Sequence, residues 1–99
     1  MNKYYKLMEV LDKETRRPVE NPATKYLGQV VLPSIPVVGM SMLVQNLVGE
    51  GFITSTVEEV TYGVTSSNAE VGYFKLEPSE STVTKEVITR NTVYVFLKN

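Results

Sequence analysis

The sequence contains neither cysteine nor histidine. Without cysteine the chain has no disulfide bond, no thiol nucleophile and no thiolate ligand for zinc. Without histidine it has no imidazole ligand for a metal, and it lacks the side chain most often used in acid–base catalysis. The absence of cysteine fits a reducing compartment. These two absences argue against a metal site and exclude the commonest forms of nucleophilic catalysis.

The sequence also lacks a large excess of charge of one sign, and it lacks long hydrophobic runs. The formal net charge is −1, which gives no field strong enough to predict a nucleic acid, a membrane or an acidic ligand as partner. No stretch approaches the ~18 apolar residues of a membrane-spanning helix. The first residues do not form a signal peptide, so we expect a cytoplasmic protein. With 99 residues, of which 42% are hydrophobic and 21% charged, residues 1–99 are expected to form one globular domain.

What the sequence does contain is concentrated in its last stretch, Thr84 to Leu97, which is rich in β-branched and aromatic residues. Such side chains fit a pleated, half-buried surface. In an extended strand Val93 and Val95 share one face while Tyr94 lies on the other, so both faces are apolar, as in a central strand. Because the stretch exceeds the usual strand length, we expect a break near Arg90–Asn91.

Further strands are expected along the rest of the chain, separated by polar, glycine- or proline-containing connections. The expected strands are Tyr4–Leu11 (with a bulge or an edge position), Tyr26–Leu32, Phe52–Tyr62 and Val71–Leu76, and the main loops are Asp12–Lys25 and Gly63–Glu70. Strands at this spacing predict an all-β protein, a small antiparallel barrel or sandwich of SH3-like or OB-like type.

The segment Met40–Val48 fits two patterns. Its apolar residues match the helical i, i+3, i+4, i+7 spacing, but the segment is short and Met42 would lie on the polar face. As a strand it places Met42 and Val44 on one face. We favour the strand, so the protein should contain at most one short helix, in this segment. Gly49-Glu50-Gly51 is then a tight turn, with the glycines expected to supply positive φ angles.

The connection Pro33–Gly39 is unusually apolar for a loop. Either Ile35, Val37 and Val38 plug one end of the core, or they bind a partner or a second copy of the chain. The plug is the preferred interpretation, and the three residues are also the candidate partner-binding residues. Val38→Asp separates the two interpretations, because a buried carboxylate would unfold the domain.

No motif for catalysis is present. Glu58 and Glu59 are adjacent in an expected strand and therefore point to opposite faces, so they cannot act as a pair. The serines and threonines lack a histidine base, and no glycine-rich phosphate-binding motif occurs. We expect a non-enzymatic protein with no cofactor and no metal.

Binding of single-stranded nucleic acid is the main alternative, because small β-barrels bind strands through aromatic platforms and basic grooves. The candidate contacts, which would also serve a small nucleotide, are Tyr73, Lys75, Arg90 and Tyr94. The slightly acidic overall charge and the scattered basic residues disfavour it, so a protein partner or self-association is the preferred prediction.

From Gly39 onward the features follow a recognisable order, in which Ile53-Thr54-Ser55-Thr56-Val57 is followed by a terminal Thr89-Arg90-Asn91-Thr92-Val93-Tyr94. This order resembles the carboxy-terminal half of short β-rich proteins of phages and mobile elements. The resemblance implies a small-β fold and an accessory or anti-defence role, exerted by blocking a host protein or by sequestering a signal nucleotide. It carries no catalytic residue, and it implies the cytoplasm of the host cell as the location if a phage encodes the protein.

Overall fold

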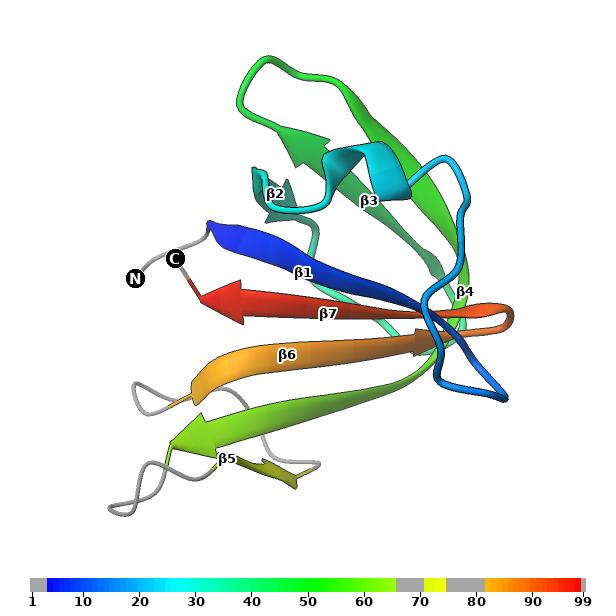
Figure 1. The fold of residues 1–99 in the computed structure, drawn as a ribbon, viewed down its shortest axis with the longest axis vertical. Coiled ribbons are helices and arrows are strands. Elements are labelled where there is room, and N and C mark those ends of the chain that lie inside the picture. Colours follow the sequence, from blue (N-terminus) through cyan, green and yellow to red (C-terminus); the bar gives the residue numbers. More distant parts are fainter. Residues whose placement is uncertain (1–3, 66–70, 75–81, 99) are drawn as a thin grey trace.

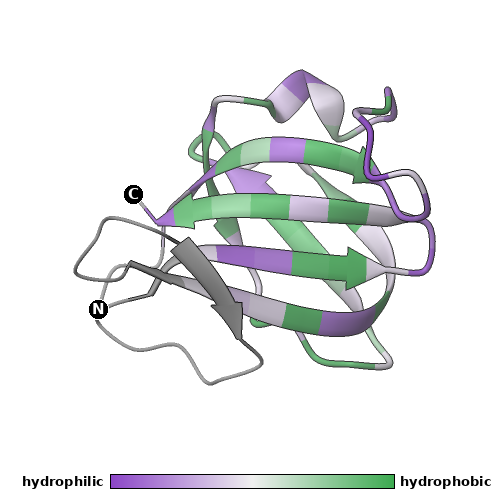
Figure 2. Ribbon diagram, turned by 60° about the horizontal axis from the view of Figure 1, so that its bottom comes forward, coloured by the Kyte–Doolittle hydropathy of each residue, from purple (hydrophilic) through white to green (hydrophobic). Residues whose placement is uncertain are grey.

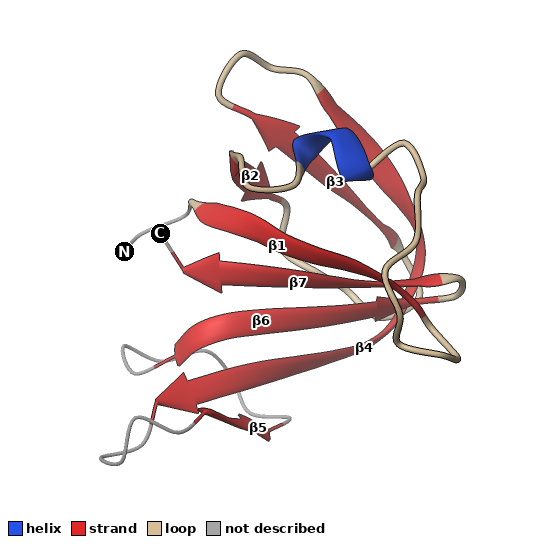
Figure 3. Ribbon diagram, viewed as in Figure 1, coloured by secondary structure: helices blue, strands red, loops and turns tan. Residues whose placement is uncertain are grey.

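The computed structural model describes residues 4–65, 71–74 and 82–98, and these form strands with a single three-residue 3-10 helix (Figure 3). The strands are β1 (Tyr5–Asp12), β2 (Val30–Pro33), β3 (Ser41–Asn46), β4 (Gly51–Thr65), β5 (Val71–Phe74), β6 (Thr82–Thr89) and β7 (Thr92–Lys98), and the helix η1 spans Thr24–Tyr26. The prediction of an all-β protein is confirmed. The segment 40–48 is a strand, so the helical alternative is wrong there.

All seven strands belong to one antiparallel sheet with the order β3-β2-β1-β7-β6-β4-β5 (Figure 1). β3 pairs with β4 as well as with β2, and this pairing closes β1, β2, β3, β4, β6 and β7 into a ring. The long strand β4 makes the closure: its first residues pair with β3 and its later residues with β6. β5 pairs with the far end of β4 and lies outside the ring. The prediction of a small antiparallel barrel or sandwich is therefore confirmed.

The barrel interior is filled from all six strands of the ring. β7 contributes Tyr94 and Phe96, β1 contributes Leu7 and β4 contributes Val57, all of them buried. Tyr94 stacks on Phe52 with ring centroids 5.5 Å apart, and Phe96 meets Tyr5 edge-on at 6.3 Å. In Figure 2 hydrophobic segments alternate with pale or purple ones along several strands of the wall, as the two-residue period of a strand requires.

A second, smaller cluster lies on the outside of the wall, where Leu11, Val93 and Val95 are buried with Ile88 packed against them. β7 is therefore apolar on both faces, as predicted from its sequence. The chain beyond β1 returns beside this strand, since Leu11 and Pro18 form an isolated bridge. Arg16 in this return pairs with Glu86 at 2.7 Å, on the outer side of β6. The predicted loop 12–25 thus contributes a contact to the wall.

Several strand boundaries differ from the prediction. β1 contains the expected bulge, between Leu7 and Glu9, but it is a central strand rather than an edge. Tyr26 belongs to η1 and not to β2, because residues 23–29 form turns that close one side of the barrel. β4 continues through Gly63 to Thr65, where a loop was predicted, because β5 and β6 pair with both of its edges there.

The turn between β3 and β4 uses its two glycines differently. Gly49 has a φ of +87°, as predicted. Gly51 does not have a positive φ; it is required because a Cβ at this position would collide with the backbone carbonyl oxygen of Val44 across the hairpin. The asparagine before the turn holds it together, since the side-chain oxygen of Asn46 accepts hydrogen bonds from the backbone N–H groups of Val48 and Glu50.

Candidate functional site

The largest group of exposed aliphatic side chains lies on β2, β3 and the first part of β4, together with the loops that join them. We call it the apolar face. It consists of Leu32, Ile35, Val37, Val38, Met40, Leu43, Leu47, Val48 and Ile53. Ile35 is 86% exposed and Val48 is 78% exposed. Exposed apolar residues scattered singly are ordinary, whereas a group of this size is a candidate interaction surface.

Strand pairing fixes the centre of the apolar face. Leu43 on β3 lies directly opposite Ile53 on β4, and Leu32 on β2 lies opposite Gln45 on β3. Val44 is buried in the barrel, so its neighbours Leu43 and Gln45 point outward by strand alternation. The loop 34–40 begins beside Leu43, whose N–H and C=O both bond to Ser34. It ends beside β4, where Met40 and Gly39 bond to Val57.

The preferred interpretation of the loop as a core plug is wrong. Ile35, Val37 and Val38 are exposed, and only Pro33 at the start of the segment is buried. The core at this end of the barrel is already filled by Met42, which is buried and whose N–H donates to the Thr54 hydroxyl. The alternative, in which the three residues face a partner, stays a prediction.

Most of the apolar face was not predicted from the sequence. Leu43, Leu47 and Ile53 were placed in expected strands, but neither face of those strands was assigned to solvent. A signal was present. Between Lys25 and Glu50 the chain contains no charged residue, and Glu50 is the only one before Glu58. A strand with one face in solvent normally carries polar and charged residues on that face. An uncharged run of this length therefore indicates strands whose outer face is covered by another molecule or segment.

A second feature lies on the inner side of the barrel wall. There Lys85 on β6 is only 6% exposed. Its Nζ lies 4.4 Å from the centre of the Tyr5 ring and 5.8 Å from that of Phe96. We call these two rings the aromatic bracket. Phe96 and Tyr62 are the cross-strand neighbours of Lys85. Sequence analysis did not single out Lys85, because nothing in the alternation of β6 shows which face turns inward.

Burial lowers the pKa of Lys85 from its ordinary value to about 8, because the charged ammonium loses solvation. Burial also raises the pKa of Tyr5. The adjacent Glu86 does not neutralise the lysine, since it points to the outer face and pairs with Arg16. Among the described residues, the Lys85 ammonium thus contacts aromatic rings and no carboxylate.

Of the four candidate ligand contacts, the structure describes the side chains of Tyr94 and Arg90, and these two do not share an exposed surface. Tyr94 lies in the core and is only 5% exposed. Burial raises its pKa, and this effect outweighs the hydrogen bonds with the side chains of Thr92 and Asn21, which lower it. A ligand would have to open the barrel to stack on it. Arg90 is exposed in the turn between β6 and β7. Lys75 and the side chain of Tyr73 lie outside the described residues.

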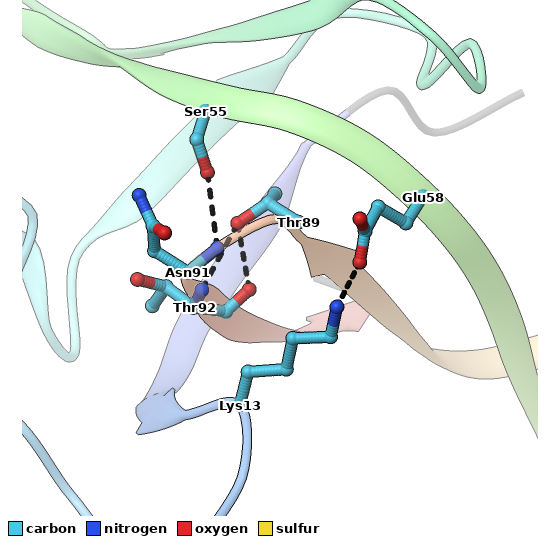
Figure 4. Close-up of polar contacts among 6 residues, drawn as sticks. All are labelled: Lys13, Ser55, Glu58, Thr89, Asn91 and Thr92. Atoms are coloured by element: carbon cyan, nitrogen blue, oxygen red, sulfur yellow. Dashed lines mark hydrogen bonds and ion pairs between the residues drawn. The ribbon is translucent and has the colours of Figure 1, made fainter.

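The turn that carries Arg90 is firmly held (Figure 4). The Thr89 hydroxyl donates to the backbone carbonyl of Thr92 and accepts from its N–H, at 2.7 Å and 3.2 Å. On β4, Ser55 Oγ accepts from the N–H of Asn91. Lys13 pairs with Glu58 nearby. The contact between Ser55 and Asn91 fastens the turn to β4, as does the hydrogen bond from the Arg90 N–H to the carbonyl oxygen of Thr56.

No family of known proteins matches this chain, and no curated protein or solved structure matches it either. Within the described residues, no helix has the length and apolar character needed to cross a membrane. The same residues contain no group of three or more acidic side chains placed to hold a metal ion.

Proposed function

We propose that this protein is a non-enzymatic binding protein that associates with a second copy of itself through the apolar face. The observation that carries the proposal is the exposure of nine aliphatic side chains on one sector of the barrel. Together they expose roughly as much apolar surface as five fully exposed aliphatic side chains, on the order of 500 Å². This is at the upper end of the largest patch on a typical monomer, about 300–600 Å².

The area fits a protein partner. A stable interface buries about 800 Å² on each side, with an apolar centre and a polar rim. The apolar face supplies over half of that area, and the exposed polar residues Ser34, Ser41 and Gln45 supply polar groups beside it. A small ligand would leave most of this surface in water.

The charge pattern favours a second copy as that partner. A charged partner finds no complement, because the chain between Lys25 and Glu50 carries no charge. A second copy meets no like-charge repulsion, and a two-fold interface uses the same patch on both subunits. The backbone of β3 is already paired on both sides, so the contact would be made by side chains, face to face, rather than by strand addition.

The resemblance to small accessory proteins of phages and mobile elements is compatible with this proposal, since it implies a role exerted by blocking a host protein or by sequestering a signal nucleotide. Blocking a host protein would use the same apolar face.

Sedimentation velocity over a range of micromolar concentrations tests the proposal. We expect a dimer for the wild type, and monomers with unchanged circular dichroism for Ile53→Asp and Val38→Asp. Met8→Asp is the matched control, because Met8 is 45% exposed on β1, outside the apolar face. It should stay dimeric. A wild type that sediments as a monomer throughout, or aspartate variants that stay dimeric, would contradict the proposal. A monomer that captures a defined protein would point to a heterologous partner instead.

A further inference from the structure

Lys85 occupies a position that association through the apolar face does not use. Lys85 and Glu86 are consecutive in β6 and therefore point to opposite faces. Glu86 is satisfied on the outer face by Arg16, while the ammonium of Lys85 lies against the aromatic bracket of Tyr5 and Phe96. Within the described residues Lys85 has no hydrogen-bond acceptor and no carboxylate partner. A buried cation without an acid partner is unusual, because its desolvation is not offset by an ion pair.

A small part of the Lys85 surface, 6%, stays exposed. Its ammonium lies against the rings of Tyr5 and Phe96. A largely enclosed amine with aromatic neighbours suits a small reagent.

We propose that Lys85 is a covalent binding site for small aldehydes, which its side-chain amine captures as a protonated imine against the rings of Tyr5 and Phe96. The neutral amine attacks the carbonyl carbon, a C–N bond forms, and the carbonyl oxygen takes up a proton. The resulting carbinolamine loses this oxygen as water. Overall, one ammonium and one aldehyde give one protonated imine and one water, with no oxidant or reductant involved.

The aromatic bracket selects this chemistry over acylation. Ring faces attract a cation, and the protonated imine keeps the positive charge that the ammonium had. An acyl donor would give a neutral amide and lose that attraction. The lowered pKa of Lys85 supports the same reaction, because a far larger fraction of the side chain is neutral at pH 7.5 than for a lysine of ordinary pKa. Among the described residues, the other titratable side chains that the strand pairing places on this face of β1, β4 and β7 are Tyr5, Tyr62, Tyr94 and Lys98.

Lys25 provides an internal control. Its Nζ lies 5.1 Å from the centre of the Tyr26 ring, so it also contacts an aromatic face, but the residue is exposed. A difference between the two lysines therefore reports the enclosed position and not the ring contact.

The test uses the intact protein with acetaldehyde and cyanoborohydride at pH 7.5, with the modified lysines located by peptide mass spectrometry. We expect Lys85 to be labelled at least about tenfold faster than Lys25, as its neutral fraction implies. The α-amino group is counted separately, because its ordinary pKa lies near 8. Lys85→Arg should remove the fast side-chain label, and Lys25→Arg should leave it.

Unfolding in urea should abolish the advantage of Lys85, which keeps the test valid even if Lys85→Arg fails to fold. If Lys25 is labelled first in the folded protein, or if the two lysines react at equal rates, the site is a structural cation and the proposal is wrong.

Discussion

Leu43 and Ile53 lie directly opposite each other on β3 and β4, and both side chains face solvent, with 43% and 71% of their surface exposed. The next pair in the same ladder, Val44 and Phe52, points into the barrel. The hairpin therefore carries apolar side chains on both faces. One face fills the core, and the other forms the centre of the surface that we assign to self-association.

The first prediction separates these two faces. Val44→Ala should lower the free energy of unfolding by about 2 kcal/mol, because it removes buried methyl groups and leaves a cavity. Leu43→Ala should change it by less than about 0.5 kcal/mol in the monomer, because the side chain is already in water. Urea titrations at low protein concentration measure both. Equal losses would mean that the outer face is packed against something within the same chain.

The second prediction concerns Arg16, which has a φ of +58° and pairs with Glu86. Arg16→Ala removes the ion pair and keeps a side chain in the left-handed region. Arg16→Gly removes the same ion pair but relieves the backbone strain, which costs on the order of 1 kcal/mol. We expect the glycine variant to be the more stable of the two by about that amount in chemical denaturation. An alanine variant as stable as the glycine variant would mean that the turn relaxes out of this conformation.

The third prediction concerns the pH dependence of the turn after β1. The carboxylate of Asp12 accepts backbone hydrogen bonds from Thr15 and Glu14, and these lower its pKa. Because the folded pKa is below the unfolded value, the stabilisation is present above about pH 4 and is lost as the pH falls through the folded pKa. Asp12→Ala should therefore destabilise the protein at pH 7 and converge with the wild type in acid. Thermal unfolding between neutral and acidic pH measures the difference, and a gap that stays constant would contradict it.

The fourth prediction tests the cost of the charge on Lys85. The folded pKa of about 8 lies below the ordinary value near 10.4, so between these values the unfolded chain holds a proton that the folded chain has released. Stability should rise with pH across this window, and below about pH 8 the cost is present in full. Lys85→Met should raise the free energy of unfolding at pH 7 by about 1–3 kcal/mol, the rings offsetting part of the desolvation.

The comparison in the fourth prediction is made between the two proteins at each pH. Tyr5 and Tyr94 have raised pKa values, so each favours the fold at neutral pH and loses that effect as the unfolded chain ionises near pH 10. The Tyr94 effect occurs in both proteins and cancels in the difference, whereas Tyr5 contacts Lys85 and its effect begins only near pH 10, at the end of the window. A difference between wild type and Lys85→Met that does not shrink from pH 8 to pH 10 would show that the lysine is not desolvated.

Much of the fold could be predicted from local sequence. The β-branched and aromatic residues of Thr84–Leu97 require a strand that is apolar on both sides, and Arg90–Asn91 interrupts it, as the turn between β6 and β7 confirms. Because Lys6 and Glu9 fall in opposite phases of the alternation, the sequence predicted a bulge or an edge position in β1, and the bulge lies between Leu7 and Glu9. These features are local, because they follow from the two-residue period of a strand and from the residues that break it.

The positions of individual side chains relative to the barrel were decided only by the tertiary structure. Ile35 and Val38 are residue types that usually lie in a core, yet both are exposed. When β3 pairs with β4 and closes the ring, Met42 fills this end of the barrel and the loop stays outside. Tyr94 has a side chain on which a base could stack, yet it stacks on Phe52 in the core. Lys85 and Glu86 look equivalent in the sequence, yet the register of β6 sends one to the aromatic bracket and the other to Arg16. The reason is physical: strand alternation fixes which residues share a face, but only the partners of each strand determine which face turns inward.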